Sequence, residues 1–276
     1  MTPQMSLHHK AQLLIRSHGL SPRKRLGQNF MVDPLLLERM VSHASLKRSD
    51  VVLEVGAGFG FLTRLLAQKA KTVVAVEKDT RIMRVLNDEL ADLENVHFIE
   101  GDILKAAVPP FDKVVSNPPF AISSPLLFWL LEKPFETAVL TFQREFAARL
   151  DAPVGGRDYS RLTVSTYYYA ETELLDPVPK TAFYPRPDVG AVIVRLQPRP
   201  ASPFKVKDEA VFRDVVRVLF TQRNRLVRKV VLTLLRRQGL KDTEAAEKAD
   251  TLPFKDRRVR ELSPEDFGAL ANELTW

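Results

Sequence analysis

The residues best suited to chemistry in this chain are Asn117-Pro118-Pro119-Phe120, which follow the short apolar run Val114-Val115. A β-branched run that ends so abruptly predicts a buried strand stopping at its carboxyl edge. The two prolines fix backbone angles and remove two N–H donors. The segment therefore presents the Asn117 amide, the Pro118 carbonyl and the Phe120 ring, which together suit the exocyclic amine of a planar base. The alternative interpretation is a strand followed by a proline-rich turn without chemistry.

The elements that precede this segment would position a ligand beside it. A predicted strand, Val51–Val55, runs into Gly56-Ala57-Gly58-Phe59-Gly60, and a helix is expected over Phe61–Lys69. A strand, a glycine loop and a helix form a nucleotide-binding unit. Glycines at every second residue fit the dinucleotide fingerprint poorly. An acid at the strand end, Glu54, followed by this loop is instead similar to S-adenosylmethionine-binding loops.

The next two predicted strands also end in carboxylates. Thr72–Val76 leads to Glu77, about 20 residues past the glycine loop, where a carboxylate can accept hydrogen bonds from both ribose hydroxyls. Val96–Ile99 leads to Gly101-Asp102, and Asp102 could accept a hydrogen bond from the adenine amine of a cofactor. Either acid alone could be a strand-end cap or a surface charge. Successive strands that all end in ligand-type residues indicate a binding edge of an open α/β sheet.

Composition limits the class of protein. A chain of 276 residues can hold one large α/β domain and one small domain. No apolar run approaches the ~18 residues of a membrane span, and residues 1–20 lack a signal peptide. The absence of cysteine excludes disulfides, thiolate nucleophiles and the zinc deaminase route to adenine, and it favours a cytoplasmic protein. No histidine has metal-ligand spacing, so we expect no metal; the net charge of +7 predicts an anionic partner.

The order of elements predicts an α/β fold, with a seven-stranded Rossmann-like sheet over residues 1–198. Its last two strands, Glu173–Val178 and Ala191–Leu196, lack a connecting helix and are expected to be antiparallel. Their connection, Lys180–Asp188, has the composition of an ordered loop. Residues 160–170 are ambiguous, because three tyrosines favour a strand whereas the position in the chain favours a helix.

A composition shift at Pro198-Arg199-Pro200 predicts a boundary, after which residues 199–276 form a small all-helical domain. This domain holds seventeen basic and twelve acidic residues, which is +5 of the net +7. A basic cluster is expected at one helix start: Arg223, Arg225, Arg228 and Lys229. A second lies near the N-terminus: Arg23, Lys24 and Arg25. Each could be a solvated face. Arginine at a helix start opposes the helix dipole, so we expect another interaction at the first cluster. The N-terminal cluster is followed by Leu26–Phe30, whose glycine, amides and aromatic are unlike a disordered tail, so we expect both clusters to contact the anionic partner.

Several segments together resemble one family. These are Arg23–Phe30, Glu54–Gly60, Glu77, Gly101-Asp102, Asn117–Phe120, Phe142–Glu145, Tyr159–Leu162, Phe183–Pro187 and Phe220–Arg223. They are similar to the KsgA family of small-subunit ribosomal RNA adenine N6-dimethyltransferases, in its archaeal and eukaryotic branch. The glycine loop alone is shared with many methyltransferases, whereas the Gly-Gln-Asn-Phe and Phe-X-Gln-Arg segments are more specific.

The resemblance implies an S-adenosylmethionine-dependent methyltransferase domain and a helical RNA-binding domain. It implies dimethylation of two adjacent adenosines near the 3′ end of small-subunit rRNA, during ribosome biogenesis, by a cytoplasmic monomer. The implied cofactor contacts are Gln28, Asn29, Met31, Gly56, Gly58, Glu77, Lys78, Asp102, Ile103 and Asn117. The implied catalytic residues are Asn117, Pro118 and Phe120, and Arg144 joins the two basic clusters as an RNA contact. One departure is Phe120, which replaces the usual tyrosine of the family.

The chemistry of this segment can be argued independently of the family. Adenine N6 is a poor nucleophile, because its lone pair is delocalised into the ring. Hydrogen bonds to the Asn117 side-chain oxygen and the Pro118 carbonyl would favour a pyramidal nitrogen, and alignment with the methyl donor supplies much of the remaining rate. No strong base is required, and Phe120 would replace the stacking lost when the base leaves its neighbours.

Two other classes fit the same residues. One is an adenine methyltransferase that acts on DNA or on large-subunit rRNA. The other is a non-catalytic assembly or transcription factor that keeps the fold and binds RNA. Intact Glu77, Asp102 and Asn117 argue against the second class.

Overall fold

The computed structural model describes residues 5–23, 27–237 and 239–274. The chain divides into two compact units. The first comprises Met1–Ala147 and Thr172–Pro198, and the second comprises Ala148–Glu171 and Arg199–Trp276. The predicted boundary after Pro198 coincides with this division. The assignment of residues 148–171 to the sheet domain does not, because these residues belong to the helical unit.

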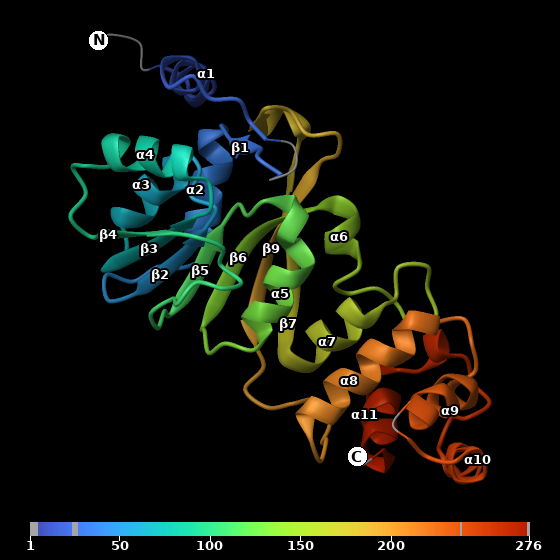
Figure 1. Ribbon diagram of the computed structural model, residues 1–276. Coiled ribbons are helices and arrows are strands. Elements are labelled where there is room, and N and C mark those ends of the chain that lie inside the picture. The colour runs from blue at the N-terminus through green and yellow to red at the C-terminus, as the bar shows by residue number, and fades with distance from the viewer. Residues whose placement is uncertain (1–4, 24–26, 238, 275–276) are drawn as a thin grey trace. The chain divides into compact units, whose positions relative to one another are not determined.

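The first unit is built on a seven-stranded sheet in the order β4-β3-β2-β5-β6-β9-β7 (Figure 1). Its strands are β2 (Val51–Val55), β3 (Thr72–Glu77), β4 (Val96–Glu100), β5 (Lys113–Ser116), β6 (Thr137–Gln143), β7 (Ala170–Val178) and β9 (Ala191–Pro198). Neighbouring strands from β4 to β6 are parallel, and β9 is antiparallel to β6. The α/β fold and the number of strands are therefore confirmed.

The order of the strands places a switch point between β2 and β5. The chain runs outward from β2 through β3 to β4, and then returns to β5 on the other side of β2. Leu53 on β2 pairs with Val74 on one side and Val114 on the other, and all three are buried. Open α/β sheets bind ligands at the carboxyl ends of the strands beside such a point.

Helices cover both faces of this sheet. The helices of the first unit are α1 (Leu7–Ser17), α2 (Pro34–His43), α3 (Phe61–Ala67), α4 (Thr80–Glu89), α5 (Ser123–Leu131) and α6 (Arg144–Ala148), of which α1 packs on β8 (Phe183–Tyr184) of a separate small sheet. α2 packs on β5 and β6, while α3 and α4 pack on β3; α5 lies on the front of the sheet in Figure 1. The expected start of α2 is present: Asp33 accepts a hydrogen bond from Leu35 N at 3.0 Å, and Pro34 opens the helix.

A small second sheet was not expected from the sequence. β1 (Phe30–Met31) pairs antiparallel with β8 (Phe183–Tyr184), and Val32 N donates to Ala182 O at 2.8 Å. β8 lies in the segment expected to be an ordered loop. Two-residue strands leave no periodic pattern in a sequence, which explains the omission. Their pairing fixes the segment that follows Gly27.

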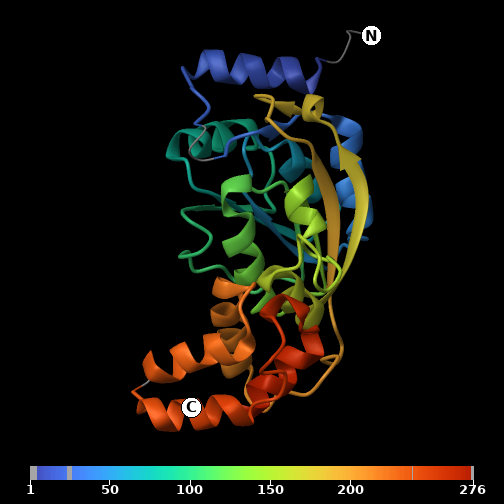
Figure 2. The same cartoon turned by 90° about the vertical axis from the view of Figure 1, so that its right-hand side faces the viewer.

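The second unit is helical and has its own core. It contains α7 (Arg161–Tyr169), α8 (Glu209–Leu219), α9 (Val227–Arg237), α10 (Asp242–Thr251) and α11 (Pro264–Glu273), seen in another direction in Figure 2. The ambiguous tyrosine-rich segment is thus a helix. Tyr159 and Tyr168 are buried with Phe212 and Phe267, and Tyr159 Oη donates to Leu262 O at 2.7 Å. Burial of these tyrosines is the physical reason that residues 148–171 join this unit.

Candidate functional site

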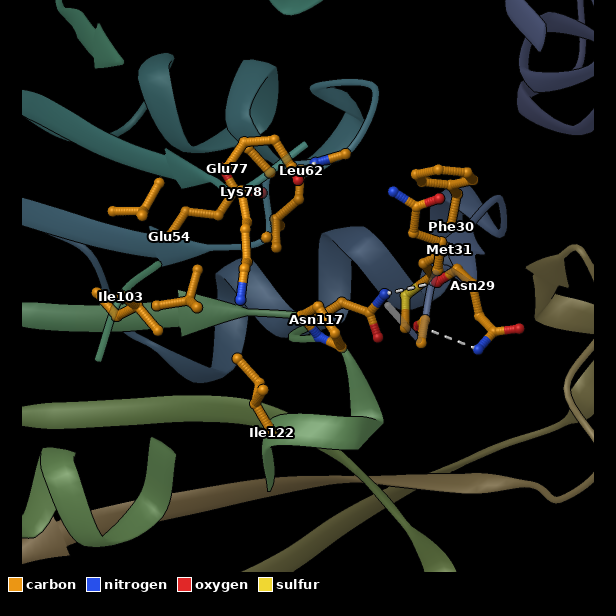
Figure 3. Close-up of a pocket in the computed structure, with 18 of the residues that line it drawn as sticks. Asn29, Phe30, Met31, Glu54, Leu62, Glu77, Lys78, Ile103, Asn117 and Ile122 are labelled. Atoms are coloured by element: carbon orange, nitrogen blue, oxygen red, sulfur yellow. Dashed lines mark hydrogen bonds between the residues drawn. The ribbon is translucent and has the colours of Figure 1, made fainter. Parts of the chain in front are cut away.

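A cavity opens at the carboxyl ends of the parallel strands in the first unit. All ten residues expected to contact the cofactor line it: Gln28, Asn29, Met31, Gly56, Gly58, Glu77, Lys78, Asp102, Ile103 and Asn117. They come from β1, the glycine loop and the ends of β3, β4 and β5, and Figure 3 shows several of them converging. The switch point of the sheet is therefore also the site of this cavity.

The glycine loop lies close to the two segments that face it. Gly56 has φ +75°, and a Cβ there would lie 2.8 Å from Pro119 Cδ. Gly58 has φ +57°, and a Cβ would lie 2.8 Å from Phe30 Cδ1. Residues other than glycine rarely adopt a backbone conformation with positive φ. The loop thus leaves its backbone exposed to a ligand while it packs against Pro119 and β1.

Glu77 ends β3 as a buried carboxylate with two backbone donors. Its Oε2 accepts a hydrogen bond from Gly58 N at 3.1 Å, and its Oε1 accepts one from Asp79 N at 2.9 Å. Burial raises the pKa of Glu77. A carboxylate has about four lone-pair positions, so both oxygens can still accept hydrogen bonds from hydroxyls in the cavity.

Asp102 and Lys78 form an ion pair at the cavity wall. Lys78 Nζ lies 2.8 Å from Asp102 Oδ2, and Leu104 N donates to Asp102 Oδ1 at 3.1 Å. The Lys78 ammonium lowers the pKa of Asp102. Asp102 therefore presents a charged acceptor beside Ile103, whose backbone follows it along the cavity wall.

Glu54 is a cavity residue to which we assigned no contact from the sequence. It is the penultimate residue of β2 and is 2% exposed, and its Oε2 has no hydrogen-bond partner among the described residues. Burial raises the pKa of Glu54 to about 8, and the neighbouring Glu77 acts in the same direction. Its place as a strand-end acid before the glycine loop was the signal that could have identified it.

Asn117 lies between β1 and the cavity with a fixed amide orientation. Its Nδ2 donates to Asn29 O at 3.2 Å (Figure 3). Its Oδ1 is buried and has no hydrogen-bond partner among the described residues. Since a buried acceptor without a partner is costly, this oxygen is available to a donor brought by a ligand. Glu54 Oε2 is a second buried polar atom of the cavity without a hydrogen-bond partner among the described residues.

The other two residues expected to be catalytic, Pro118 and Phe120, do not line the cavity. Pro118 is buried, and Pro119, Ala121 and Ile122 line the cavity in its place. Phe120 does not line the cavity; its half-buried ring packs edge-on against Phe183 at 5.8 Å between centroids.

Apolar side chains of the cavity were also not identified from the sequence. Phe30 and Phe59 lie 4.0 Å apart between ring centroids, and Leu62 and Ile122 are among the other apolar residues that line the cavity. Phe59 belongs to the glycine loop, but loop position alone does not show on which side a ring packs.

The described basic residues expected to contact RNA in the first unit, Arg23 and Arg144, keep exposed side chains. The Arg23 side chain is 42% exposed, and its Nη1 lies 4.0 Å from Asp79 Oδ2. Arg144 is exposed at the start of α6. Lys24 and Arg25 lie outside the described residues.

The arginine cluster of the second unit separates into two kinds of residue. Arg223 donates to Arg157 O at 2.8 Å and to Gly156 O at 2.7 Å. Arg228 Nε lies 2.6 Å from Asp250 Oδ1. Arg225 and Lys229 are exposed, and no side-chain partner contacts either one within the described ranges. Arg223 and Arg225 precede α9, which begins at Val227, whereas Arg228 and Lys229 lie in its first turn.

Two absences apply to the part of the chain that the structure describes. No group of three or more histidine or acidic side chains is close enough there to hold a metal ion. No helix in the same ranges has the length and apolar composition that crossing a bilayer requires.

Comparison with known sequences identifies close relatives. A family model described as ribosomal RNA adenine dimethylase matches residues 19–275. A protein of Methanosarcina acetivorans named probable ribosomal RNA small subunit methyltransferase A is 45% identical over 249 residues, which cover 90% of this chain and 91% of that protein. A protein of Pyrococcus abyssi with the same name is 38% identical and covers 95% of both chains.

Comparison with solved structures gives the same picture. A dimethyladenosine transferase from Plasmodium falciparum matches with a TM-score of 0.74 and 30% identity, over 86% of this chain and 94% of that chain. The 23S rRNA methyltransferase ErmE matches with a TM-score of 0.64 and 30% identity, over 89% of this chain and 99% of that chain.

Proposed function

Because the chain belongs to the ribosomal RNA adenine dimethylase family, we propose that its cavity holds S-adenosylmethionine and that Asn117 presents the target amine to it. The protein is an S-adenosylmethionine-dependent methyltransferase of the rRNA adenine N6 amine. S-adenosylmethionine supplies the methyl group. The steps left to this chain are to bind the cofactor, to orient the base and to exclude water from the reacting atoms.

The observation that carries this proposal is the free Oδ1 of Asn117. The Nδ2 bond to Asn29 O fixes the amide, so that the buried Oδ1 is the remaining polar atom of the side chain. A target N6–H is a suitable donor for it. The Pro118 carbonyl, next in the chain, supplies the second acceptor. Two such bonds favour the pyramidal nitrogen from which a lone pair can attack.

The cofactor contacts are proposed from the cavity lining. Glu77 accepts hydrogen bonds from the ribose hydroxyls, and Asp102 with the Ile103 backbone binds the adenine edge. Gly56 and Gly58 allow the backbone of the loop to approach the cofactor closely. The remaining sides of the cofactor are enclosed by Gln28, Asn29, Met31 and Lys78. Glu77→Ala should remove acceptors worth ~1–3 kcal/mol. We therefore expect calorimetry to show S-adenosylmethionine binding weakened by at least several-fold, and unchanged affinity would contradict the Glu77 assignment.

RNA contacts are proposed for exposed cations of both units. Arg23 and Arg144 serve in the first unit, together with Lys24 and Arg25 as in the sequence prediction. Arg225 and Lys229 serve in the second unit, where they lack side-chain partners within the described ranges. Arg223 and Arg228 are weaker candidates, because their guanidinium groups already bind Gly156, Arg157 and Asp250.

We propose the small ribosomal subunit or its precursor as the natural substrate, modified at adjacent adenosines near the 3′ end of its RNA. The names of the archaeal relatives support this choice. On the evidence of composition, with no cysteine in the chain, we place the enzyme in the cytoplasm. We propose that it acts as a monomer, which light scattering of the purified protein with and without RNA would test.

The test compares methyl transfer with binding in Asn117→Ala. Each enzyme is incubated with small subunits and cofactor, and the rRNA nucleosides are analysed by mass spectrometry. The wild type should form dimethyladenosine, and Asn117→Ala should form it at a rate at least about 100-fold lower. RNA affinity should change far less. Asn87→Ala, an exposed residue of α4, is the matched control. Equal losses of transfer and RNA binding would mean that Asn117 is structural.

The same assay separates the alternative functions. The ErmE similarity makes large-subunit rRNA the strongest competing substrate, so it is offered in parallel with small subunits and with DNA. Preferred methylation of either would overturn the substrate assignment. RNA binding with no methylation of any substrate would favour a non-catalytic assembly factor.

A further inference from the structure

Asp79 is a buried charged residue that the proposed function leaves without a role. It follows Lys78 and caps α4, where its Oδ1 accepts a hydrogen bond from Arg81 N at 3.1 Å. Its side chain is only 2% exposed. A capping aspartate needs one or two backbone donors of the first helical turn, and these do not require a buried charge.

Asp79 also gathers side chains from a distant part of the chain. Its Oδ2 accepts hydrogen bonds from Gln28 Nε2 at 3.0 Å and from Arg81 Nη2 at 2.6 Å, and Arg23 Nη1 lies 4.0 Å away. The hydrogen bonds of Arg81 lower the pKa of Asp79 to about 2. The carboxylate is therefore ionised wherever the enzyme works, and it holds residues about fifty positions earlier in sequence.

The same residue is bonded to the proposed cofactor site. Asp79 N donates to Glu77 Oε1 at 2.9 Å, and Gln28 Oε1 accepts a hydrogen bond from Arg23 N at 2.7 Å. A continuous path thus runs from Arg23 through Gln28 and Asp79 to Glu77. Gln28 and Glu77, two members of this path, both line the cavity.

We propose that Asp79 is a positioning residue that couples RNA binding by the Arg23 segment to retention of the cofactor. The proposal rests on the proposed function of the cavity and of Arg23. A phosphate bound to the exposed side of Arg23 holds this segment, and Asp79 keeps the attached Gln28 on the cavity wall. The first ligand to bind thereby fixes Arg23 and Gln28 in the conformation that both ligands need. The second ligand then loses less conformational entropy on binding, so it binds more tightly. Linkage requires the effect to be reciprocal.

Calorimetry measures the coupling directly in the full-length protein. The dissociation constant of S-adenosylhomocysteine, which cannot react, is determined with and without a short single-stranded oligoribonucleotide. We expect RNA to tighten binding on the order of ten-fold in the wild type, and by less than about two-fold in Asp79→Asn. Asparagine is a good helix cap, so α4 keeps its start while the charge that holds Arg81 and Arg23 is lost.

Two further variants keep the test decisive. Gln28→Leu breaks the path without changing α4, so it should also abolish the tightening, and the double variant should lose no more than either single variant. Asp92→Asn is the matched control, because Asp92 also forms an ion pair with an arginine, Arg64 at 2.7 Å, but lies away from this path. It should keep the wild-type ratio. Amide hydrogen exchange of Ser21 and Arg23 should slow when the cofactor analogue binds, and Asp79→Asn should remove this protection.

The outcomes separate this proposal from the proposed function. Asn117→Ala should lose methyl transfer but keep the tightening by RNA. A wild-type ratio near one in an enzyme that methylates small subunits would overturn the coupling alone. A wild-type ratio retained by Asp79→Asn would show that the residue is only a helix cap, and the coupling would again be wrong. Absence of methylation with the tightening intact would overturn the proposed function alone.

Discussion

Two unpartnered polar atoms distinguish the cavity at the scale of single residues. Asn117 Oδ1 and Glu54 Oε2 are both buried without hydrogen-bond partners among the described residues. Folded proteins satisfy most buried polar groups, so each exception calls for an explanation. A polar ligand explains both atoms, because it can bring an N–H donor to Asn117 Oδ1 and a hydrogen-bond partner to the protonated carboxyl of Glu54.

Glu54 should make the stability of the protein depend on pH. Burial raises the pKa of Glu54 from its ordinary value of 4.5 to about 8. The folded state keeps a proton through this window that the unfolded state loses, so the free energy of unfolding decreases as pH rises from about 4.5 to about 8. In Glu54→Gln this decrease should be absent. At about 1.4 kcal/mol per pKa unit, the variant should gain on the order of a few kcal/mol at pH 9 relative to wild type.

Chemical denaturation at pH 5 and pH 9 measures this difference. Glu94→Gln, which changes an exposed carboxyl, should leave the pH dependence of wild type unaltered. A variant at Glu54 whose stability followed the wild-type profile would show that the buried carboxyl does not retain its proton.

Phe120 should contribute its ring face and not a hydroxyl. The ring is half-buried against Phe183, and stacking of a base on an aromatic side chain is worth ~1–3 kcal/mol. Phe120→Ala should therefore slow single-turnover methyl transfer by roughly 5- to 150-fold. Phe120→Tyr should retain transfer, while Phe120→Leu, which keeps apolar volume without a π-face, should resemble alanine. An inactive tyrosine variant would contradict this role for the ring.

At the scale of elements, the segment between α8 and α9 shows that a cluster of arginines need not have one function. Arg223 anchors the carbonyls of Gly156 and Arg157, and these two bonds connect a loop of residues 148–171 to the helices. Arg225 and Lys229 in the same stretch point to solvent. All members of the cluster carry a positive charge, but some bind other residues of the protein and others are exposed to solvent.

Replacing Arg225 and Lys229 by alanine should reduce the salt dependence of RNA binding without loss of stability. Each phosphate contact contributes a slope of about −0.7 to −0.9 in log affinity against log salt, so the slope should flatten by about 1.4 to 1.8. Arg223→Ala should instead lower the free energy of unfolding by ~1–3 kcal/mol, with little change in slope. Fluorescence anisotropy across a salt series and urea denaturation give the two quantities. An unchanged slope in the double variant would assign Arg225 and Lys229 to a solvated face.

At the scale of the whole molecule, the chain builds two separate cores. The core of the second unit combines Tyr159 and Tyr168 from residues 148–171 with Phe212 and Phe267 from the C-terminal helices. A truncation at Pro198 keeps every strand of the sheet but removes the helices that bury these tyrosines. The segment left behind would expose a large apolar surface.

We expect the chain of residues 1–198 to bind a hydrophobic dye and to unfold at a lower temperature than the full-length protein. A second variant removes residues 199–276 and also replaces residues 148–171 by a flexible glycine-serine linker. This variant matches the first unit, so it should unfold cooperatively and bind S-adenosylmethionine. If the simple truncation matched the full-length protein in both dye binding and unfolding temperature, the division into these units would be wrong.

The sequence by itself determined the strands of the large sheet, the glycine loop and the polar strand-end residues that face the cavity. Strand-end positions, glycine spacing and helix caps are local features, and the carboxyl ends of parallel strands necessarily meet at one edge. For this reason Glu77, Asp102 and Asn117 could be placed together before their contacts were known.

Only the tertiary structure decided the features that depend on contacts between distant residues. These are the pairing of β1 with β8, the burial of Tyr159 in the helical core, the engagement of Arg223 and the bonds from Asp79 to Gln28. None leaves a periodic pattern, because each depends on where a residue far away in the chain is brought. The free oxygen of Asn117 belongs with them, since the bond from its amide to Asn29 spans 88 positions.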